Sequence, residues 1–262
     1  MQFDYQGNTI NIVGYDDKDW IYKSIVINQE FYELSLLEYM RYALKGCQGI
    51  MLDIGANIGN HAVYFGMFVS KYVVCFEPNP LVIPMLEKNL SKNKINYTLY
   101  KCALGEKSES AVLEYPAEGL NNIGGAKVIP GSVGAENCVQ VNRLDDLLLS
   151  IEKKYPDLPI SAIKIDVEGM ESSVLSGALK TLGKHMPDLF LEVLNKGSME
   201  DIESILNPLG YKKVVAFASS PVWHFVPISR YREKKTKALW YKVRAKSIRI
   251  LRRGLRAFGS KS

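Results

Sequence analysis

The chain has 262 residues, of which 47% are hydrophobic and 23% are charged, a composition typical of a soluble globular protein with one sizeable core. No stretch of about 18 residues is free of charge, which excludes a membrane-spanning helix. The polar first residues, MQFDYQGNTI, predict no secretory signal peptide, and four cysteines without CxxC spacing predict reduced thiols in a cytoplasmic protein.

The net charge of +5 is unevenly distributed along the chain. Residues 230–262 contain 13 Lys and Arg and one acid, Glu233, which gives this segment a charge of +12. The other 229 residues carry 20 basic and 27 acidic side chains, or −7. The sequence therefore predicts an acidic domain followed by a basic tail, and the two need separate explanations.

The first 49 residues predict a small N-terminal extension. Short alternating runs such as IYKSIVI (21–27) indicate strands, whereas residues 33–46 have the apolar spacing of a helix that ends at a glycine. We expect this extension to precede the main domain, which spans residues 50–229.

Within residues 50–229 apolar strands alternate with amphipathic helices. We expect strands at 49–54, 72–77, 95–104, 110–116, 138–144, 160–167, 188–194, 211–218 and 222–228, and helices at 59–70, 79–94, 144–155, 170–184 and 198–210. The glycine-rich segment 119–134 is predicted to be a loop. This alternation predicts an α/β fold with a parallel sheet covered on both faces. The last two strands are joined too tightly for a crossover helix and must be antiparallel.

The loop after the first strand of this sheet indicates a nucleotide-like ligand, because such sheets bind ligands beyond the C-terminal ends of their strands. The strand reaches Asp53, and the loop GANIG follows, with Gly55 and Gly59 at its ends. Asn57 replaces the middle glycine of a dinucleotide motif, and the Lys-Ser/Thr pair of a P-loop is absent. The second strand ends in Glu77, whose carboxylate can accept hydrogen bonds from two ribose hydroxyls.

A nucleoside without phosphates explains these features, and S-adenosylmethionine (SAM) fits. Glu77 would take its ribose, the backbone N–H groups from Gly55 to Gly59 its carboxylate, and Asp53 its ammonium group.

Five motifs in order resemble the FkbM family of SAM-dependent methyltransferases over about residues 48–228. They are DIGANIG (53–59), FEPNP (76–80), ALGE (103–106), RLDDLL (143–148) and IKIDVEGMESSVLSGA (163–178). The resemblance implies the class I (Rossmann-like) methyltransferase fold, with a mostly parallel seven-stranded sheet and an antiparallel last strand. It also implies SAM as cofactor and O-methylation, often of a sugar hydroxyl on a glycan or a natural product.

The resemblance further implies that Cys102, Ala103 and Leu104 lie beside the adenine. One position departs from the family pattern. A His often follows the acid of LFLEV by two positions, and Leu194 stands there in this chain. Any role of that histidine is therefore not expected in this protein.

Three acids are expected to meet at the reacting end of the cofactor. Asp166 ends the strand at 160–167, Glu168 follows two residues later, and Glu192 ends the next strand. Either one of them has a raised pKa and acts as general base, or two of them with Asn195 hold a divalent metal. We favour the general base, which needs no extra component. Lys164 is expected either to pair with Asp166 or to orient an acceptor hydroxyl.

Other polar residues near the strand ends have simpler interpretations. Asn121 and Asn122, in the loop NNIGG, are expected to contact the acceptor. Glu171 is expected to be a first-turn helix acid. His61, His185 and His224 are expected to have structural roles.

Three classes of function compete. The first is an O-methyltransferase acting on a saccharide, glycan or glycolipid, or on a natural product. The second is an RNA methyltransferase or another nucleic-acid-binding module that uses the basic tail, which the acidic body disfavours. The third is a non-catalytic SAM-binding protein, which the presence of all the strand-end acids disfavours.

The tail, residues 230–258, has the pattern of a basic amphipathic helix. Its apolar stripe consists of Trp240, Val243, Ile248, Leu251, Leu255 and Phe258, and it is flanked by Arg244, Lys246, Arg249, Arg252, Arg253 and Arg256. Such a helix suits the surface of an anionic bilayer, on the cytoplasmic face of the membrane. The alternatives are a solvated basic end and a nucleic-acid-binding segment.

Overall fold

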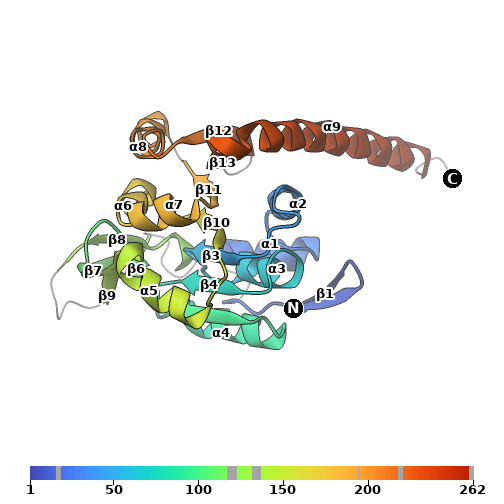
Figure 1. Ribbon diagram of the computed structural model, residues 1–262. Coiled ribbons are helices and arrows are strands. Elements are labelled where there is room, and N and C mark those ends of the chain that lie inside the picture. The colour runs from blue at the N-terminus through green and yellow to red at the C-terminus, as the bar shows by residue number, and fades with distance from the viewer. Residues whose placement is uncertain (16–18, 117–122, 132–136, 194, 218–220, 260–262) are drawn as a thin grey trace.

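The computed structural model describes residues 1–15, 19–116, 123–131, 137–193, 195–217 and 221–259, with the backbone alone for 245–259. In this part of the chain, helices cover both faces of a seven-stranded sheet, and a four-stranded sheet lies to one side. A long C-terminal helix runs along the top of the view and extends beyond the body (Figure 1).

The large sheet has an order typical of ligand-binding α/β proteins. From edge to edge, its strands are β12 (Tyr211–Phe217), β13 (Val222–Pro227), β11 (Asp188–Glu192), β10 (Ile160–Ile165), β3 (Ile50–Ile54), β4 (Val73–Phe76) and β5 (Tyr97–Tyr100). The pairs from β11 to β5 are parallel, and β13 runs antiparallel to both its neighbours. The predicted α/β class and the antiparallel last strand are confirmed. The sheet is only partly parallel, because β13 inserts between β11 and β12.

Two sets of helices cover the two faces. On one face lie α2 (Leu34–Ala43), α3 (Asn60–Phe68) and α4 (Ile83–Lys92), and on the other lie α5 (Leu144–Lys154), α6 (Glu171–Ser176), α7 (Leu179–His185) and α8 (Lys196–Leu206). The single helix predicted at 170–184 is wrong. The helix is interrupted at Gly177, which packs closely on another segment: a Cβ atom at this position would lie only 1.9 Å from the Gly105 carbonyl oxygen.

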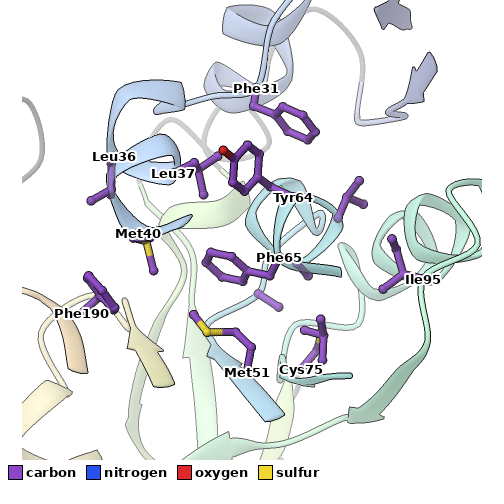
Figure 2. Close-up of a cluster of buried hydrophobic side chains, with 14 of the residues drawn as sticks. Phe31, Leu36, Leu37, Met40, Met51, Tyr64, Phe65, Cys75, Ile95 and Phe190 are labelled. Atoms are coloured by element: carbon purple, nitrogen blue, oxygen red, sulfur yellow. The ribbon is translucent and has the colours of Figure 1, made fainter. Parts of the chain in front are cut away.

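The core is divided by the sheet, because successive side chains of a strand point to opposite faces. Met51 of β3 belongs to one hydrophobic cluster, with Phe65 of α3 and Phe31 of the N-terminal segment (Figure 2). Leu52 belongs to the other cluster, with Leu148 of α5. Both faces of β3 are therefore buried, as its continuous apolar sequence predicts.

The small sheet corrects two expectations. In the described residues it consists of β6 (Ala103–Leu104), β9 (Cys138–Asn142), β7 (Glu109–Glu114) and β8 (Lys127–Pro130). The strand predicted at 95–104 is split, because β5 is the edge strand of the large sheet and the chain leaves it to pair with β9. β8 falls within the segment 119–134 that was predicted to be a loop, and it pairs with β7.

The run at 21–27, which was predicted as strand, forms helix α1 (Trp20–Asn28). Its start is set by Asp19, whose Oδ1 accepts a 2.8 Å hydrogen bond from the Tyr22 amide, as an N-cap residue does. Ile25 is fully buried while Ile27 is 68% exposed, so the alternation in this run does not correspond to the two faces of a sheet. The N-terminal strands are β1 (Gln2–Tyr5) and β2 (Asn8–Asn11), which form a hairpin.

Asn89 of α4 and Asn93, the C-cap residue of this helix, bind the N-terminal segment to the main domain. Asn89 accepts a 2.7 Å hydrogen bond from the Val13 N–H and donates one of 2.8 Å to the Val13 carbonyl. Asn93 bonds the N–H and carbonyl of Asn11 in the same way, at 2.9 and 2.6 Å. These amides satisfy backbone groups that would otherwise lack partners. The N-terminal segment also packs on the main domain, since Phe3 shares a core cluster with residues of α3.

The basic tail forms helix α9 (Ile228–Gly259), whose first half is part of the domain. Lys234 is only 5% exposed, and its Nζ lies 2.7 Å from Asp188 Oδ2 and donates to the Ala43 carbonyl at 2.7 Å. The Tyr241 hydroxyl donates to the Ser35 carbonyl at 3.2 Å. The packed domain thus continues well past the boundary predicted at residue 230. None of the helices in the described residues is long and apolar enough to cross a bilayer.

Candidate functional site

A pocket opens at the C-terminal ends of the central strands, beside the reversal of strand order between β3 and β10. Its walls come from the loops after β3 and β4, the ends of β10 and β11, the small sheet and the N-terminal segment. The predicted residues that line it are Gly55, Asn57, Glu77, Cys102, Ala103, Leu104, Lys164, Asp166, Glu168 and Glu192. Asp53 and Gly59 are not among the described lining residues, and Asn121 and Asn122 lie outside the described part of the chain.

The loop after β3 needs its glycines for close packing. Gly55 has φ of 78°, and a Cβ atom on it would lie 1.9 Å from the Asp166 carbonyl oxygen. Gly59 has φ of 87°, and a Cβ atom there would lie 2.7 Å from the Leu86 side chain. Gly55 thus seats this loop directly on the segment after β10, which brings Asp166 into the pocket.

Glu77, which follows β4, is a buried carboxylate with spare acceptor capacity. Its Oε2 accepts a 2.7 Å hydrogen bond from the Asn57 amide and its Oε1 one of 2.9 Å from the Asn79 amide. Each oxygen has a second lone pair. Burial raises the pKa of Glu77 to about 7, although the two N–H groups and Lys164 oppose this. Two further hydroxyl donors, such as those of a ribose, fit this group.

Replacing Glu77 by Ala is expected to weaken SAM binding at least tenfold. The change removes an acceptor of two hydrogen bonds, each worth about 1.5–3 kcal/mol at most. Isothermal titration calorimetry measures the affinity, and circular dichroism checks the fold. Glu87→Ala, on the outer side of α4, is the control and should bind SAM as the wild type does. Equal affinities of both variants would mean that Glu77 does not bind the ribose.

Lys164, on β10, connects two acids of the site. Its Nζ lies 3.3 Å from Asp53 Oδ1 and 3.3 Å from Asp166 Oδ2, and it donates to the Gly55 carbonyl at 2.9 Å. Burial lowers the pKa of Lys164, but the two carboxylates outweigh this effect and raise the pKa above its ordinary value. Of the two predicted roles, the geometry shows pairing with Asp166. Asp53 is fully buried behind this lysine, so its influence on a ligand runs through Lys164.

Asp166 and Glu192 form a carboxylate pair joined by a side-chain hydrogen bond. Burial raises the pKa of Asp166, but the charge of Lys164 and the bond to Glu192 outweigh this, so the pKa is lowered. Burial and the charge of Asp166 raise the pKa of Glu192 to about 8. The two pKa values are thus shifted in opposite directions, which makes Glu192 the member of the pair that is protonated more readily.

Glu168 and Glu171 follow in the next loop and differ in what they do. Burial raises the pKa of Glu168, which lines the pocket with φ of 55°. Glu171, the first residue of α6, accepts hydrogen bonds from the Val167 and Gly169 amides at 3.3 and 3.2 Å. Glu171 thus holds the loop that carries Glu168.

Asn195, which was proposed to hold a metal together with two of the acids, does not join them in the pocket. Asn195 caps α8, where its Oδ1 accepts a 3.0 Å hydrogen bond from the Ser198 amide, and it does not line the pocket. Nowhere in the described residues are three or more His, Cys, Asp or Glu side chains grouped to hold a metal ion. Leu194, at the position where the family often has His, lies outside the described residues.

An apolar slot lies beside Glu77, formed by Phe76, Ala103, Leu104 and Val128. Cys102 is next to it and is 5% exposed. Cys102, Ala103 and Leu104, which the family resemblance places beside the adenine, are all lining residues of the pocket.

Asn79, which the sequence did not single out, holds two neighbouring segments in place through side-chain hydrogen bonds. Its Nδ2 donates to the Ile123 carbonyl at 3.1 Å, and its Oδ1 accepts from the Tyr115 hydroxyl at 3.0 Å. Its signal in the sequence is its place in FEPNP, two residues after Glu77.

A wall from the N-terminal segment was also missed. It includes Trp20, which is 64% exposed, together with Tyr32 and Glu33. Asn60 fixes the backbone of Tyr32, since its Oδ1 accepts from the Tyr32 amide and its Nδ2 donates to the Tyr32 carbonyl, both at 3.0 Å. His61 also lines the pocket, and its Nε2 lies 3.5 Å from Glu33 Oε2.

The other two histidines lie outside this pocket. His185 Nε2 is 2.9 Å from Glu152 Oε1, and the Tyr39 hydroxyl is 2.8 Å from His224 Nδ1. These contacts agree with the structural roles expected for them.

The pocket is strongly acidic. Among the described lining residues, one lysine, Lys164, accompanies six acids, which are Asp19, Glu33, Glu77, Asp166, Glu168 and Glu192. This charge attracts a cationic ligand and repels a polyanion. SAM carries a sulfonium and an ammonium group and therefore fits the pocket in charge.

The strand order and the acid after the second strand of the sheet define a class I SAM-dependent methyltransferase. The chain belongs to the methyltransferase FkbM domain family, which matches residues 53–213. A comparison with curated proteins finds no significant match.

Several solved structures are similar to part of this chain. One is a methyltransferase FkbM from Methylobacillus flagellatus, with 20% identity and a TM-score of 0.47 over 68% of this chain and 43% of that chain. The chain thus spans less than half the length of that protein. Others are an rRNA methylase from Streptococcus thermophilus (12% identity, TM-score 0.43, 72% of this chain and 91% of that chain) and a precorrin-6y C5,15-methyltransferase from Geobacter metallireducens (16%, 0.43, 72% and 84%). Likenesses this distant do not identify a substrate.

Proposed function

We propose that the protein is an O-methyltransferase that acts on a hydroxyl group of a saccharide, as such or within a glycan or glycolipid intermediate. The observation that carries this proposal is the Asp166–Glu192 pair, in which Glu192 has a pKa of about 8. A base with a pKa near the working pH is suited to take the proton of a hydroxyl group.

The cofactor would be held by groups that the pocket already presents. SAM, when bound, supplies the activated methyl group. Glu77 would accept hydrogen bonds from the ribose, and the slot of Phe76, Ala103 and Leu104 would enclose the adenine. The prediction that the loop from Gly55 to Gly59 binds the carboxylate through its backbone N–H groups is wrong, because all five of these N–H groups already donate hydrogen bonds within the protein.

The chain's own residues would then position the acceptor and remove its proton. Ionised Glu192 takes the proton of the acceptor hydroxyl, and the negative charge of Asp166 strengthens Glu192 as a base. Lys164 keeps Asp166 ionised and in place. Positioning of this kind contributes much of the rate in transfer reactions.

The pocket wall favours a neutral polyhydroxylated acceptor. Carboxylates such as Glu168 and Glu33 can accept hydrogen bonds from hydroxyls, and the ring of Trp20 offers a flat apolar surface to one face of a sugar. A nucleic acid would bring its phosphates to an acidic pocket, which is unfavourable. A natural-product hydroxyl remains the alternative acceptor, and RNA is the least favoured.

Trp20→Ala is expected to raise KM for the acceptor about five- to tenfold with little change in kcat, because it removes a stacking surface worth about 1 kcal/mol. The assay incubates the protein with radioactive SAM and separate saccharide, glycolipid, natural-product and RNA fractions. Ile27→Ala, on the same helix but outside the pocket, is the control. Labelling of RNA alone would contradict the proposed acceptor. Labelling of no fraction would contradict the proposal that the protein transfers a methyl group to these acceptors.

A further inference from the structure

Residues 239–243 of α9 carry three apolar side chains on the side of the helix that points away from the domain. The buried side chains of the first half of this helix are Lys234 and Ala238, and Tyr241 is half-buried on the same side. At about 100° per residue, positions 239, 240 and 243 fall on the opposite side. Their side chains, Leu239, Trp240 and Val243, are 67, 58 and 60% exposed. Three large apolar side chains thus form one uncovered surface, which we call the outward patch.

Positive charge surrounds the outward patch. Lys235, Lys242 and Arg244 are exposed, and the Arg244 guanidinium lies 6.0 Å from the centre of the Trp240 ring. The sequence after Arg244 adds six Lys and Arg and no acid. The chain before the tail is acidic, and the basic helix extends beyond this acidic body (Figure 1).

We propose that the outward patch of α9 binds the surface of an anionic membrane, with the helix lying in the plane of the headgroups. Such a surface satisfies both features at once, since its acyl boundary covers apolar side chains while its headgroups attract the flanking cations. A nucleic-acid duplex would satisfy the charge and leave Leu239, Trp240 and Val243 uncovered. The first half of α9 is packed on the domain, so binding would hold the whole protein at the membrane.

The test uses the full chain and vesicles of phosphatidylcholine with or without phosphatidylglycerol. We expect the protein to sediment with the phosphatidylglycerol vesicles at low salt, to be released at high salt, and to stay in solution with phosphatidylcholine alone. The triple variant L239S/W240S/V243S should lose at least tenfold in binding. The matched control I27S/L149S/L179S, which changes three exposed apolar residues on other helices, should bind as the wild type does.

Two outcomes would overturn the proposal. The first is that the wild type does not sediment with the anionic vesicles, or that the triple variant binds them as tightly as the control. The second is that duplex RNA displaces the protein from the vesicles and binds the triple variant and the wild type equally. SAM affinity, measured on each variant, should be unchanged, which separates this surface from the proposed methyl transfer.

Discussion

Replacing Glu192 by Gln is expected to lower the turnover of methyl transfer about 100-fold or more, with SAM affinity nearly unchanged. Glutamine keeps the size and one acceptor oxygen but cannot take a proton. The hydrogen bond to Asp166 can persist through the amide, so the geometry of the pocket should remain. Single-turnover rates, measured with saturating SAM and an acceptor found in the survey above, give the comparison.

The pH profile distinguishes a base from a structural role. The pKa of Glu192 is raised to about 8, so Glu192 loses its proton only as the pH rises through that value. The wild-type kcat/KM should therefore increase with pH up to about 8 and then level off. In Glu192→Gln this increase should disappear. A variant that keeps the increase would show that the base lies elsewhere.

Asp166→Asn is the companion variant. It should lower turnover by about 10² as well, and it removes the negative charge that helps to raise the pKa of Glu192. The increase of kcat/KM should consequently move to lower pH. If EDTA abolishes activity and Mg²⁺ or Mn²⁺ restores it, the metal alternative replaces the general base.

Lys164→Met is expected to destabilise the protein by about 3–5 kcal/mol, because it leaves a buried carboxylate without its counter-ion. Asp53 is fully buried, and neither of its carboxylate oxygens has a hydrogen-bond partner among the described residues. The ion pair with Lys164, at 3.3 Å, therefore compensates the negative charge of Asp53. Urea unfolding measures the free energy of unfolding.

Two further variants test whether the uncompensated charge of Asp53 causes the loss of stability in Lys164→Met. Adding Asp53→Asn to Lys164→Met removes the stranded charge and should restore a large part of the stability. Lys101→Met breaks an exposed ion pair with Glu87, 3.0 Å long, and should cost at most about 1 kcal/mol. If Lys164→Met and Lys101→Met cost the same, Lys164 does not stabilise Asp53.

The sequence alone determined the features that depend on residues close together in the chain. Apolar runs that end in Asp53, Glu77, Asp166 and Glu192 mark strands, and the ends of parallel strands meet at one edge of a sheet. The α/β class and most of the pocket residues could therefore be predicted. The prediction from sequence failed where the local pattern has two interpretations. At residues 21–27 the hydrophobic residues suit either a strand or a short helix.

Only the tertiary structure decided which acid holds the proton and what surrounds the acceptor. The pKa of Glu192 depends on burial and on Asp166, which lies on another strand. The wall with Trp20 and Tyr32 exists because Asn60, 28 residues after Tyr32, holds its backbone. Lys234 turns the start of the tail into part of the domain by pairing with Asp188. Burial and charge at each of these sites depend on groups that are far apart in the sequence. A local sequence pattern therefore cannot predict these features.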